Sequence, residues 1–590
     1  MKKFSFFNHP ASSLSKAITL VISYATLLNA SAQSLSEAIK LTDKEQFEKA
    51  TVAFNAMLTA DPQNGEAWFY LGENYWSNDR TDSADFCYKR GASVSPKFPL
   101  NDVGIGKVLW LQGKVLEAQA QFDKAVAIAC DKANKCSKPL QASTYREVAE
   151  ALSQGNSKNL VKALEFIAKS QEFDPKNAET FILKGDVLFD QNPTDGGTPL
   201  ENGFKPAINL DPLNAKPVAR KAFMYYRGKN FTASIEEYSK AIAIDPLFAP
   251  AYSGRAEAYF MARDFEKATA DMNKYLELNK GSQSARIRNA QFLFLVKKYD
   301  ESLNEIQALE AQGVKNIVLV RLKAYDLTEK ADFVAAAATM KLYMAEQPEA
   351  KVISLDYEYL GKIYQGLVPK PVPPAPPVPG AVVTPPQVPA MTMNYDSLAA
   401  EMYLKAARMD RSKGYLFADA AKAYSKAKLF DRAIAAMREK IAQGKPEAND
   451  FYFLGDAANK GKHWLTADSA WATYIQRNGE AYQGYKFRAR AQNNLDSSET
   501  KTFAAKAFYE QVLQKMKPEE KEKYKADLEE ALNYMGLYNL YNKEAKDLPK
   551  ARCYFEKVKA LNAGTSITKQ VNEVMLLTKD LKDVAPGNCD

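Results

Sequence analysis

A unit that recurs every 34 residues constrains the fold of this chain more than any other feature of its sequence. In the copy at residues 65–96, Trp68 and Tyr75 lie on one face of an α-helix, and Ala84 and Tyr88 lie on one face of a second helix. Each copy therefore predicts two helices joined by a turn. A hairpin of this kind leaves one apolar face open, so the copies must stack on one another to bury it.

In residues 65–96 the unit resembles the tetratricopeptide repeat (TPR), whose W-x2-L-G-x2-Y, A-x3-F and P pattern it follows with Tyr88 in the aromatic place of the second helix. The register is clearest in the middle of the chain, where Tyr225 and Tyr259 hold the same place in consecutive copies. We count about fourteen copies on this pattern. The resemblance implies an all-α, superhelical solenoid of helix-turn-helix repeats whose concave wall is lined by the first helix of each repeat. The composition, with 46% hydrophobic and 25% charged residues, excludes wholesale disorder.

The first 32 residues predict a secretory signal peptide. Lys2 and Lys3 precede an apolar run at 17–28, and Ala30-Ser31-Ala32 follows it as a cleavage motif. The alternative, an N-terminal membrane anchor, needs about 18 apolar residues, and this run has about a dozen. No later stretch is long and apolar enough to span a bilayer. We therefore expect cleavage after Ala32 and export to the periplasm or cell envelope of a bacterium.

A proline-rich segment at 367–393 interrupts the repeats, because its composition suits neither helix nor strand. We expect a TPR array at 33–366 before it and a second array at 394–590 after it, closed by a capping helix at 566–582. The segment is either a loop inserted into one repeat or a spacer between two independent solenoids. We favour the loop, because residues 357–364 carry only the pattern of a first helix and the stretch after the segment only that of a second.

The cysteines and histidines do not form a metal-binding pattern. There is no C-x2-C pair, and His463, expected in an exposed turn, is the only histidine beyond the signal peptide. In an oxidising compartment disulfides become possible. Cys130 and Cys136 bracket a short polar loop and are the one pair close enough in sequence for a local bridge; whether they form it stays open.

No motif for catalysis or cofactor binding occurs. The sequence has no G-x-G-x-x-G after a strand, no G-x4-G-K-[ST], no G-x-S-x-G and no H-E-x-x-H. The formal charge of +8 is dispersed and includes three lysines of the signal peptide, which does not favour a nucleic-acid partner. We expect no enzyme, no cofactor and no metal.

The resemblance to TPR proteins implies a protein or peptide partner held in the concave groove, which positions 2, 5, 9 and 12 of each repeat usually face. An aromatic stripe at position 12 could grip such a partner, since aromatic side chains dominate binding hot spots. The open alternative is that these side chains pack against neighbouring helices. The stripe consists of Trp76, Trp110, Phe189, Tyr226, Phe260 and Phe294.

Position 9 excludes one kind of partner. TPR domains that clamp a C-terminal carboxylate carry Asn at this position, whereas this chain has Glu73, Lys107, Phe223, Glu257 and Gln291 there. We therefore predict a non-enzymatic interaction scaffold or adaptor of the bacterial cell envelope. A structural subunit of an envelope secretion or motility complex is the alternative, and an enzyme is the remote one.

Overall fold

The computed structural model describes residues 34–347, 351–369, 393–496, 501–561 and 565–589. These residues form helices and turns and contain no strand, as the repeat predicted. The expected signal peptide lies outside the described residues. None of the described helices combines the length and the apolar character that a membrane span requires.

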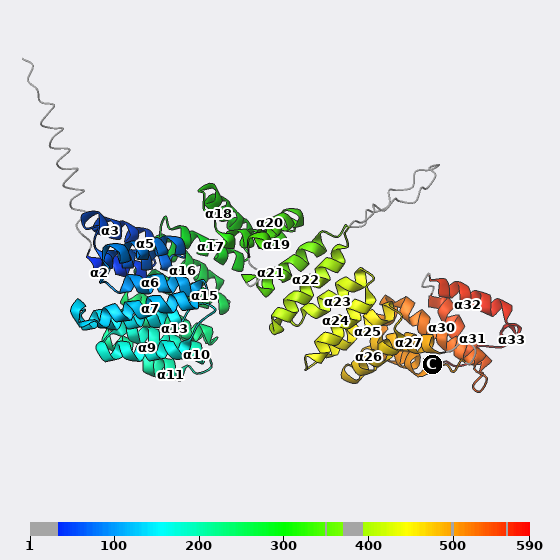
Figure 1. Ribbon diagram of the computed structural model, residues 1–590. Coiled ribbons are helices and arrows are strands. Elements are labelled where there is room, and N and C mark those ends of the chain that lie inside the picture. Colours follow the sequence, from blue (N-terminus) through cyan, green and yellow to red (C-terminus); the bar gives the residue numbers. More distant parts are fainter. Residues whose placement is uncertain (1–33, 348–350, 370–392, 497–500, 562–564, 590) are drawn as a thin grey trace, which may run out of the picture. The chain divides into compact units, whose positions relative to one another are not determined.

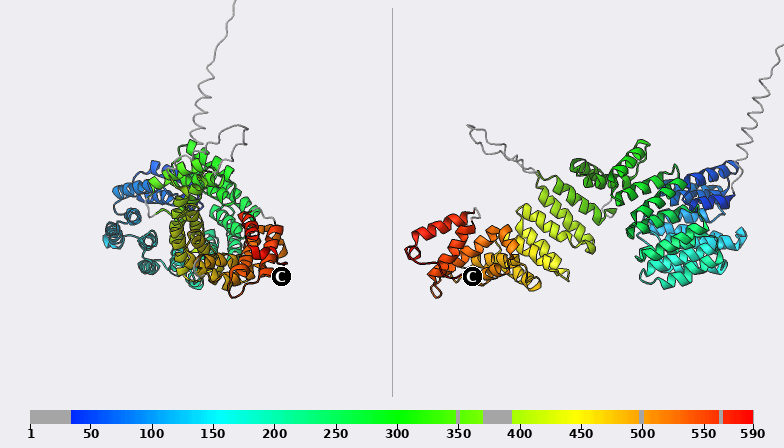
Figure 2. Two further views of the ribbon diagram at one scale, coloured as in Figure 1. Left: turned by 90° about the vertical axis from the view of Figure 1, so that its right-hand side faces the viewer. Right: turned by 180° about the vertical axis from the view of Figure 1, so that it is seen from behind.

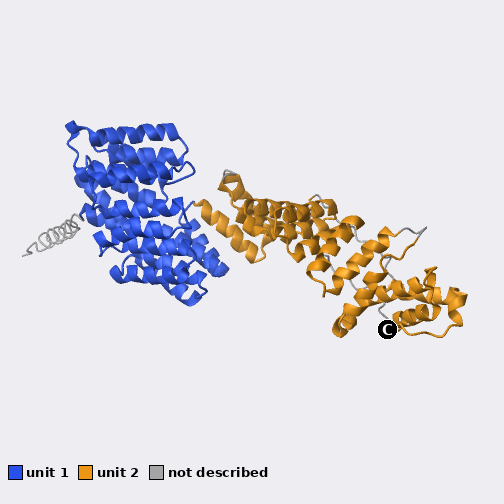
Figure 3. Ribbon diagram, turned by 90° about the horizontal axis from the view of Figure 1, so that it is seen from below, with its two compact units in different colours: residues 1–315 blue, residues 316–590 orange. Residues whose placement is uncertain are grey.

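The chain divides into two compact units, residues 1–315 (unit 1) and 316–590 (unit 2), shown in two colours in Figure 3. This boundary does not coincide with the proline-rich segment, where the sequence placed the border between two arrays. It follows α18, whose connection to the next helix carries few contacts. The helices of unit 1 are α2 (Leu35–Asp43), α3 (Phe47–Ala60), α4 (Gly65–Ser77), α5 (Thr81–Val94), α6 (Leu100–Leu111), α7 (Val115–Cys130), α8 (Lys138–Leu152), α9 (Leu160–Phe173), α10 (Ala178–Gln191), α11 (Gly197–Pro199), α12 (Lys205–Leu210), α13 (Ala215–Arg227), α14 (Phe231–Ile244), α15 (Ala249–Met261), α16 (Phe265–Leu278), α17 (Gln283–Leu295) and α18 (Tyr299–Ala311).

Unit 2 continues the same hairpins, and Figure 1 follows them in chain order from green to red. Its helices are α19 (Ile317–Glu329), α20 (Phe333–Glu346), α21 (Ser354–Gly366), α22 (Tyr395–Met409), α23 (Leu416–Lys426), α24 (Phe430–Ala442), α25 (Ala448–Lys460), α26 (Trp464–Arg477), α27 (Tyr482–Leu495), α28 (Lys506–Lys515), α29 (Pro518–Lys523), α30 (Lys525–Tyr541), α31 (Leu548–Leu561), α32 (Ser566–Leu577) and α33 (Lys579–Lys582).

Close contact between the two helices of a repeat depends on a missing side chain at position 8. A Cβ atom on Gly72 would lie 2.3 Å from Cε1 of Tyr88, the aromatic residue at position 24 of the same repeat. The ring therefore occupies the space that any larger residue would need, and both residues are buried. The pairing explains why small and aromatic residues recur 16 positions apart along the chain.

The turn between the two helices has the same backbone shape in several repeats. Asp79, Lys229 and Arg263 each follow the first helix by two residues, and each has a left-handed backbone, with φ of 55°, 60° and 65°. One left-handed residue at the end of a helix stops it and reverses the chain. A turn of constant shape keeps successive hairpins alike and lets them stack.

The helices on either side of the proline-rich segment pack against each other. A Cβ atom on Gly361 of α21 would lie 2.4 Å from the ring of Tyr403 in α22, the same contact that joins the helices of other repeats. The Ser354 hydroxyl also donates to the Ala406 carbonyl at 2.9 Å. The segment thus leaves α21 and returns to its hairpin partner, and residues 370–392 themselves lie outside the described part of the chain.

The cysteine pair that the sequence left open as a local bridge is not the pair that the structure joins. A disulfide links Cys553 of α31 to Cys589, near the C-terminus. Cys130 and Cys136 are free: the Cys130 sulfur lies 3.4 Å from the Tyr145 hydroxyl, and Cys136 donates to the Ile128 carbonyl. A short 3-10 turn at Lys132–Asn134 separates the two thiols and gives each its own polar neighbour.

Candidate functional site

A cavity of about 310 Å³ opens on the inner wall of unit 1. It is lined by first helices of the repeats: α4, α8, α10 and α13, with α2 of the first hairpin. These are the helices that the TPR pattern assigns to the concave side. Its lining residues are Ile39, Thr42, Asp43, Tyr70, Glu73, Ser77, Arg146, Glu147, Glu150, Glu179, Ile182, Leu183, Asp186 and Lys216.

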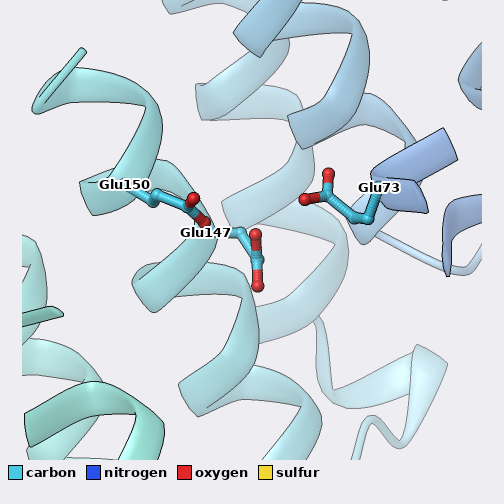
Figure 4. A group of neighbouring side chains, drawn as sticks. All are labelled: Glu73, Glu147 and Glu150. Carbon is cyan, nitrogen blue, oxygen red and sulfur yellow. The ribbon is translucent and has the colours of Figure 1, made fainter. Parts of the chain in front are cut away.

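Three carboxylates in the wall of this cavity gather around one buried lysine. Figure 4 shows Glu73, Glu147 and Glu150 pointing toward one another from α4 and α8. Lys107 of α6 has a side chain only 1% exposed, and its Nζ lies 2.9, 3.4 and 3.6 Å from carboxylate oxygens of Glu73, Glu147 and Glu150. One oxygen of each carboxylate lies within 4.8 Å of the others, a spacing that a metal ion could bridge. The ammonium group already fills that role here, so we interpret the cluster as an ion-pair network.

The network shifts the pKa values of Glu147 and Glu150 in opposite directions. Burial raises the pKa of Glu150 to about 7, and the nearby charges of Glu147 and Glu73 reinforce this against the opposing effect of Lys107. Burial also opposes the charge of Glu147, but Arg146, at 2.6 Å, and Lys107 outweigh it and lower the pKa of Glu147 to about 2. Glu150 therefore changes its charge near neutral pH while Glu147 stays ionised.

Three further ion pairs lie around the cavity, made by Lys216 and Arg220. Lys216 of α13 contacts Glu179 of α10 at 2.7 Å and Asp43 at 2.9 Å, and Arg220 binds Asp186 through its Nε at 3.0 Å. The six lining carboxylates thus face two lining bases, Arg146 and Lys216, with Lys107 and Arg220 behind them. The cavity keeps an excess of acidic groups.

The turn between α2 and α3, which form the first hairpin, closes unit 1 on itself. The last residue of α2 and the first two residues of the turn each bind a distant repeat: Asp43 pairs with Lys216, Lys44 pairs with Asp245 at 2.8 Å, and Glu45 accepts hydrogen bonds from Arg288 and Tyr275. The last two contacts bridge 243 and 230 residues of sequence. Figures 1 and 2 show the first hairpin beside α16 accordingly. The inner wall is therefore a bounded cavity where the sequence suggested an open groove.

Two of the six aromatic residues predicted to line the groove, Trp110 and Phe189, are buried, with exposed fractions of 6% and 5%. The Trp110 indole donates to the Gln154 carbonyl, and the Phe189 ring lies under Arg227. A partner cannot reach these two rings in this conformation.

The other four aromatic residues are half-buried. Tyr226, Phe260 and Phe294 each lie 5.5–6.0 Å, centroid to centroid, from the aromatic residue that begins the next helix: Phe231, Phe265 and Tyr299. The Trp76 ring lies 5.5 Å from Nζ of Lys107 and thus borders the ion-pair network. These contacts favour the packing alternative for the stripe, and a role of the four rings in binding stays a prediction.

Several residues of the charged cavity share one position of the repeat, although the sequence did not predict a cavity there. Glu73 and Lys107 occupy position 9, where the sequence excludes a carboxylate clamp, and Glu150 and Asp186 occupy the same position in their repeats. Glu73, Glu150 and Asp186 line the cavity, and Lys107 lies behind it and pairs with Glu73 and Glu150. The signal was present in the register, but the partners across the cavity come from repeats far apart in sequence.

His463 lies where the sequence placed it, in the turn before α26. Its Nε2 is 2.8 Å from Oδ1 of Asp431, and its side chain is 44% exposed. The pair lies on the surface of unit 2.

A comparison with protein-family models agrees with the repeat pattern. A family model described as TPR repeat matches residues 224–262, from the end of α13 to the end of α15. No curated protein matches the chain. Among solved structures, the C-terminal part of a TPR repeat-containing protein from Cytophaga hutchinsonii is 24% identical, over 49% of this chain and 98% of that one, with a TM-score of 0.37. A tetratricopeptide repeat protein from Parabacteroides merdae is 19% identical, over 45% and 99%, with a TM-score of 0.29. Yeast Tom70 is 13% identical, over 75% and 98%, with a TM-score of 0.36.

Proposed function

Because the chain is a tetratricopeptide-repeat protein, we propose that it is a non-enzymatic interaction scaffold that holds a protein partner at the cavity of unit 1. The observation that carries this proposal is the position of the cavity on the inner wall, where first helices of four repeats and the first hairpin converge. Concave sites built from several rigid elements are the usual places of ligand binding.

The charge and size of the cavity define the chemistry of the partner. Acidic side chains outnumber basic ones in its lining, so a lysine or arginine side chain of the partner is favoured there. A volume of about 310 Å³ accommodates a side chain or a short loop. The first hairpin bounds the wall, so the partner inserts a basic side chain and does not thread an extended segment through the unit.

We further propose that the protein is exported and acts in a bacterial cell envelope. The predicted cleavage after Ala32 would leave the first described helix whole, because Ser34 caps it and Leu35 begins it. The disulfide between Cys553 and Cys589 supports an oxidising compartment, since such bonds are rare in the cytosol of mesophiles. Detection of Gln33 as the N-terminal residue of the purified protein, by mass spectrometry, tests this part.

The partner site is tested by a charge placed in the cavity. Ser77 lines the cavity and is exposed, so its replacement leaves the ion-pair network intact. We expect Ser77→Lys to abolish recovery of the partner after in vivo crosslinking and affinity capture, because it fills the cavity with the charge that the partner would bring. Ser77→Gln, of nearly equal length but neutral, is the matched control and should retain the partner. Equal recovery with both variants would place the partner elsewhere on the chain.

A further inference from the structure

A second cavity, of about 920 Å³, lies near the C-terminus of unit 2, three times the volume of the cavity in unit 1. Residues of α28, α29, α30 and α31 line it, together with Cys589. Its volume is close to the upper end of the range, about 300–1,000 Å³, that cavities for small-molecule ligands occupy. The repeat pattern does not predict it, because the helices here vary more in length than in the middle of the chain, from 6 residues in α29 to 17 in α30.

The floor of this cavity is apolar. Leu528, Leu532 and Tyr554 are buried, with exposed fractions of 9%, 6% and 6%, and Leu513 and Leu561 are half-buried beside them. A polar molecule would gain little from this surface. A hydrocarbon chain would remove apolar area from water along it, at about 25 cal/mol for each Å² buried.

The rim of the cavity is basic. Lys521, Lys550 and Lys557 line it and are half-buried. Neither Lys521 nor Lys550 forms an ion pair with any other described residue. Glu510 is the one acidic residue in the described lining, and Lys506 binds it at 2.9 Å.

The nearby carboxylates are also engaged. Glu520 accepts a hydrogen bond from the backbone N–H of Lys517 at 3.0 Å, and Glu556 binds Arg552 at 3.0 Å. Among the described residues, no carboxylate pairs with the half-buried ammonium groups of Lys521 and Lys550 beside the apolar floor, which favours an anionic ligand there.

The C-terminal segment forms a fixed wall. The disulfide from Cys553 to Cys589 ties its end to α31, and the Gly587 N–H donates to the Pro549 carbonyl at 2.8 Å. Arg552 of α31 also donates to the carbonyls of Leu581, Lys582 and Val584. The cavity is thus shaped by bonds that do not depend on a ligand, and such preorganisation lowers the free-energy cost of binding.

We propose that this cavity binds a small anionic amphiphile, with its acyl-type chain on the leucine floor and its carboxylate or phosphate head against Lys521 and Lys550. The site lies in unit 2 and is independent of the partner cavity of unit 1. It would give the scaffold a second ligand of a different chemical class.

A fluorescent fatty acid, 11-(dansylamino)undecanoic acid, tests the proposal on the full chain. We expect saturable enhancement of its emission, displacement by dodecanoate and by dodecyl phosphate below their micellar concentrations, and little displacement by dodecanol. Comparison of dodecanoate with dodecyl phosphate identifies the preferred head group.

Three variants locate the site. Lys521→Gln/Lys550→Gln should weaken probe binding by about tenfold or more, and Ala560→Trp should block it, because Ala560 is exposed and lines the cavity. Lys559→Gln is the matched control: Lys559 is exposed on the same helix but outside the lining, so binding should be unchanged. Circular dichroism of each variant verifies that the helices are intact.

Five results would overturn the proposal, and the first four concern the amphiphile itself. These are displacement by dodecanol as strong as by dodecanoate, unchanged affinity in the double lysine variant, unchanged affinity in Ala560→Trp, and binding to vesicles of anionic lipid without binding of the monomeric amphiphile. Displacement of the probe by an acidic amphipathic peptide but not by dodecanoate would also reject it in favour of a protein ligand.

Discussion

Exchanging the charges of Glu45 and Arg288 tests whether the first hairpin closes unit 1. Oε2 of Glu45 accepts hydrogen bonds from Nη1 of Arg288 at 2.9 Å and from the Tyr275 hydroxyl at 2.8 Å. Glu45→Arg would bring two guanidinium groups together and remove the acceptor of Tyr275. Glu45→Arg/Arg288→Glu restores an attractive pair with the charges reversed.

The contacts of Glu45 define the size of the expected effect. A hydrogen bond to a charged group contributes about 1.5–3 kcal/mol when it is protected from water. The side chains of Glu45 and Arg288 are 21% and 39% exposed, so solvent screens part of this interaction. We expect Glu45→Arg to lower the free energy of unfolding of unit 1 by about 2 kcal/mol. The double variant should recover about half of the loss, because it does not restore the bond to Tyr275.

Urea unfolding followed by hydrogen–deuterium exchange and mass spectrometry measures this effect separately for each unit. Amides of α2, α16 and α17 should exchange faster in Glu45→Arg, and the change should be partly reversed in the double variant. Glu201→Arg is the matched control, because Glu201 forms an exposed pair with Lys205 four residues away and bridges no distant repeats. A double variant no more stable than the single one, or a Glu45→Arg variant indistinguishable from Glu201→Arg, would refute the closure of unit 1 by this contact.

Three further predictions follow from the contacts described above. Gly361→Ala should destabilise the α21–α22 hairpin by about 1–3 kcal/mol, because its Cβ would overlap the Tyr403 ring. Gly414→Ala is the control and should melt almost unchanged, because its Cβ would meet mainly the flexible end of the Lys440 side chain. Equal melting temperatures of the two variants would contradict this packing. The raised pKa of Glu150 means that the folded state binds its proton more tightly, so its contribution to stability is present below the unfolded pKa of about 4.3 and is lost as pH rises through about 7. Urea titrations between pH 5 and pH 8 should show this decline in the natural protein and a weaker decline in Glu150→Gln; an identical slope would exclude Glu150 as its source. Replacing residues 370–389 by a short glycine-rich turn should leave the thermal unfolding of unit 2 unchanged, because α21 and α22 pair directly; a large loss of stability would mean that the segment itself holds the hairpin together.

Local periodicity explains why the fold could be read from the sequence. The contacts within a hairpin join residues 16 positions apart, such as Gly72 with Tyr88, so a single repeat contains all the information needed for its own helices and turn. The same register correctly indicated which helices face inward. It also indicated that the helices on either side of the proline-rich segment pair with each other. Residues 357–364 carry only the pattern of a first helix, and the stretch after the segment carries only that of a second helix.

The sequence by itself determined the helical repeats and their turns, because each depends on residues within one unit of the period. The tertiary structure alone decided which inward residues meet. The closure through Glu45 and Arg288 spans 243 residues, and it depends on how the small rotation between neighbouring hairpins adds up over the whole of unit 1. The charged cavity, the buried Lys107 and the bond between Cys553 and Cys589 arise in the same way, from the approach of helices that no local pattern relates.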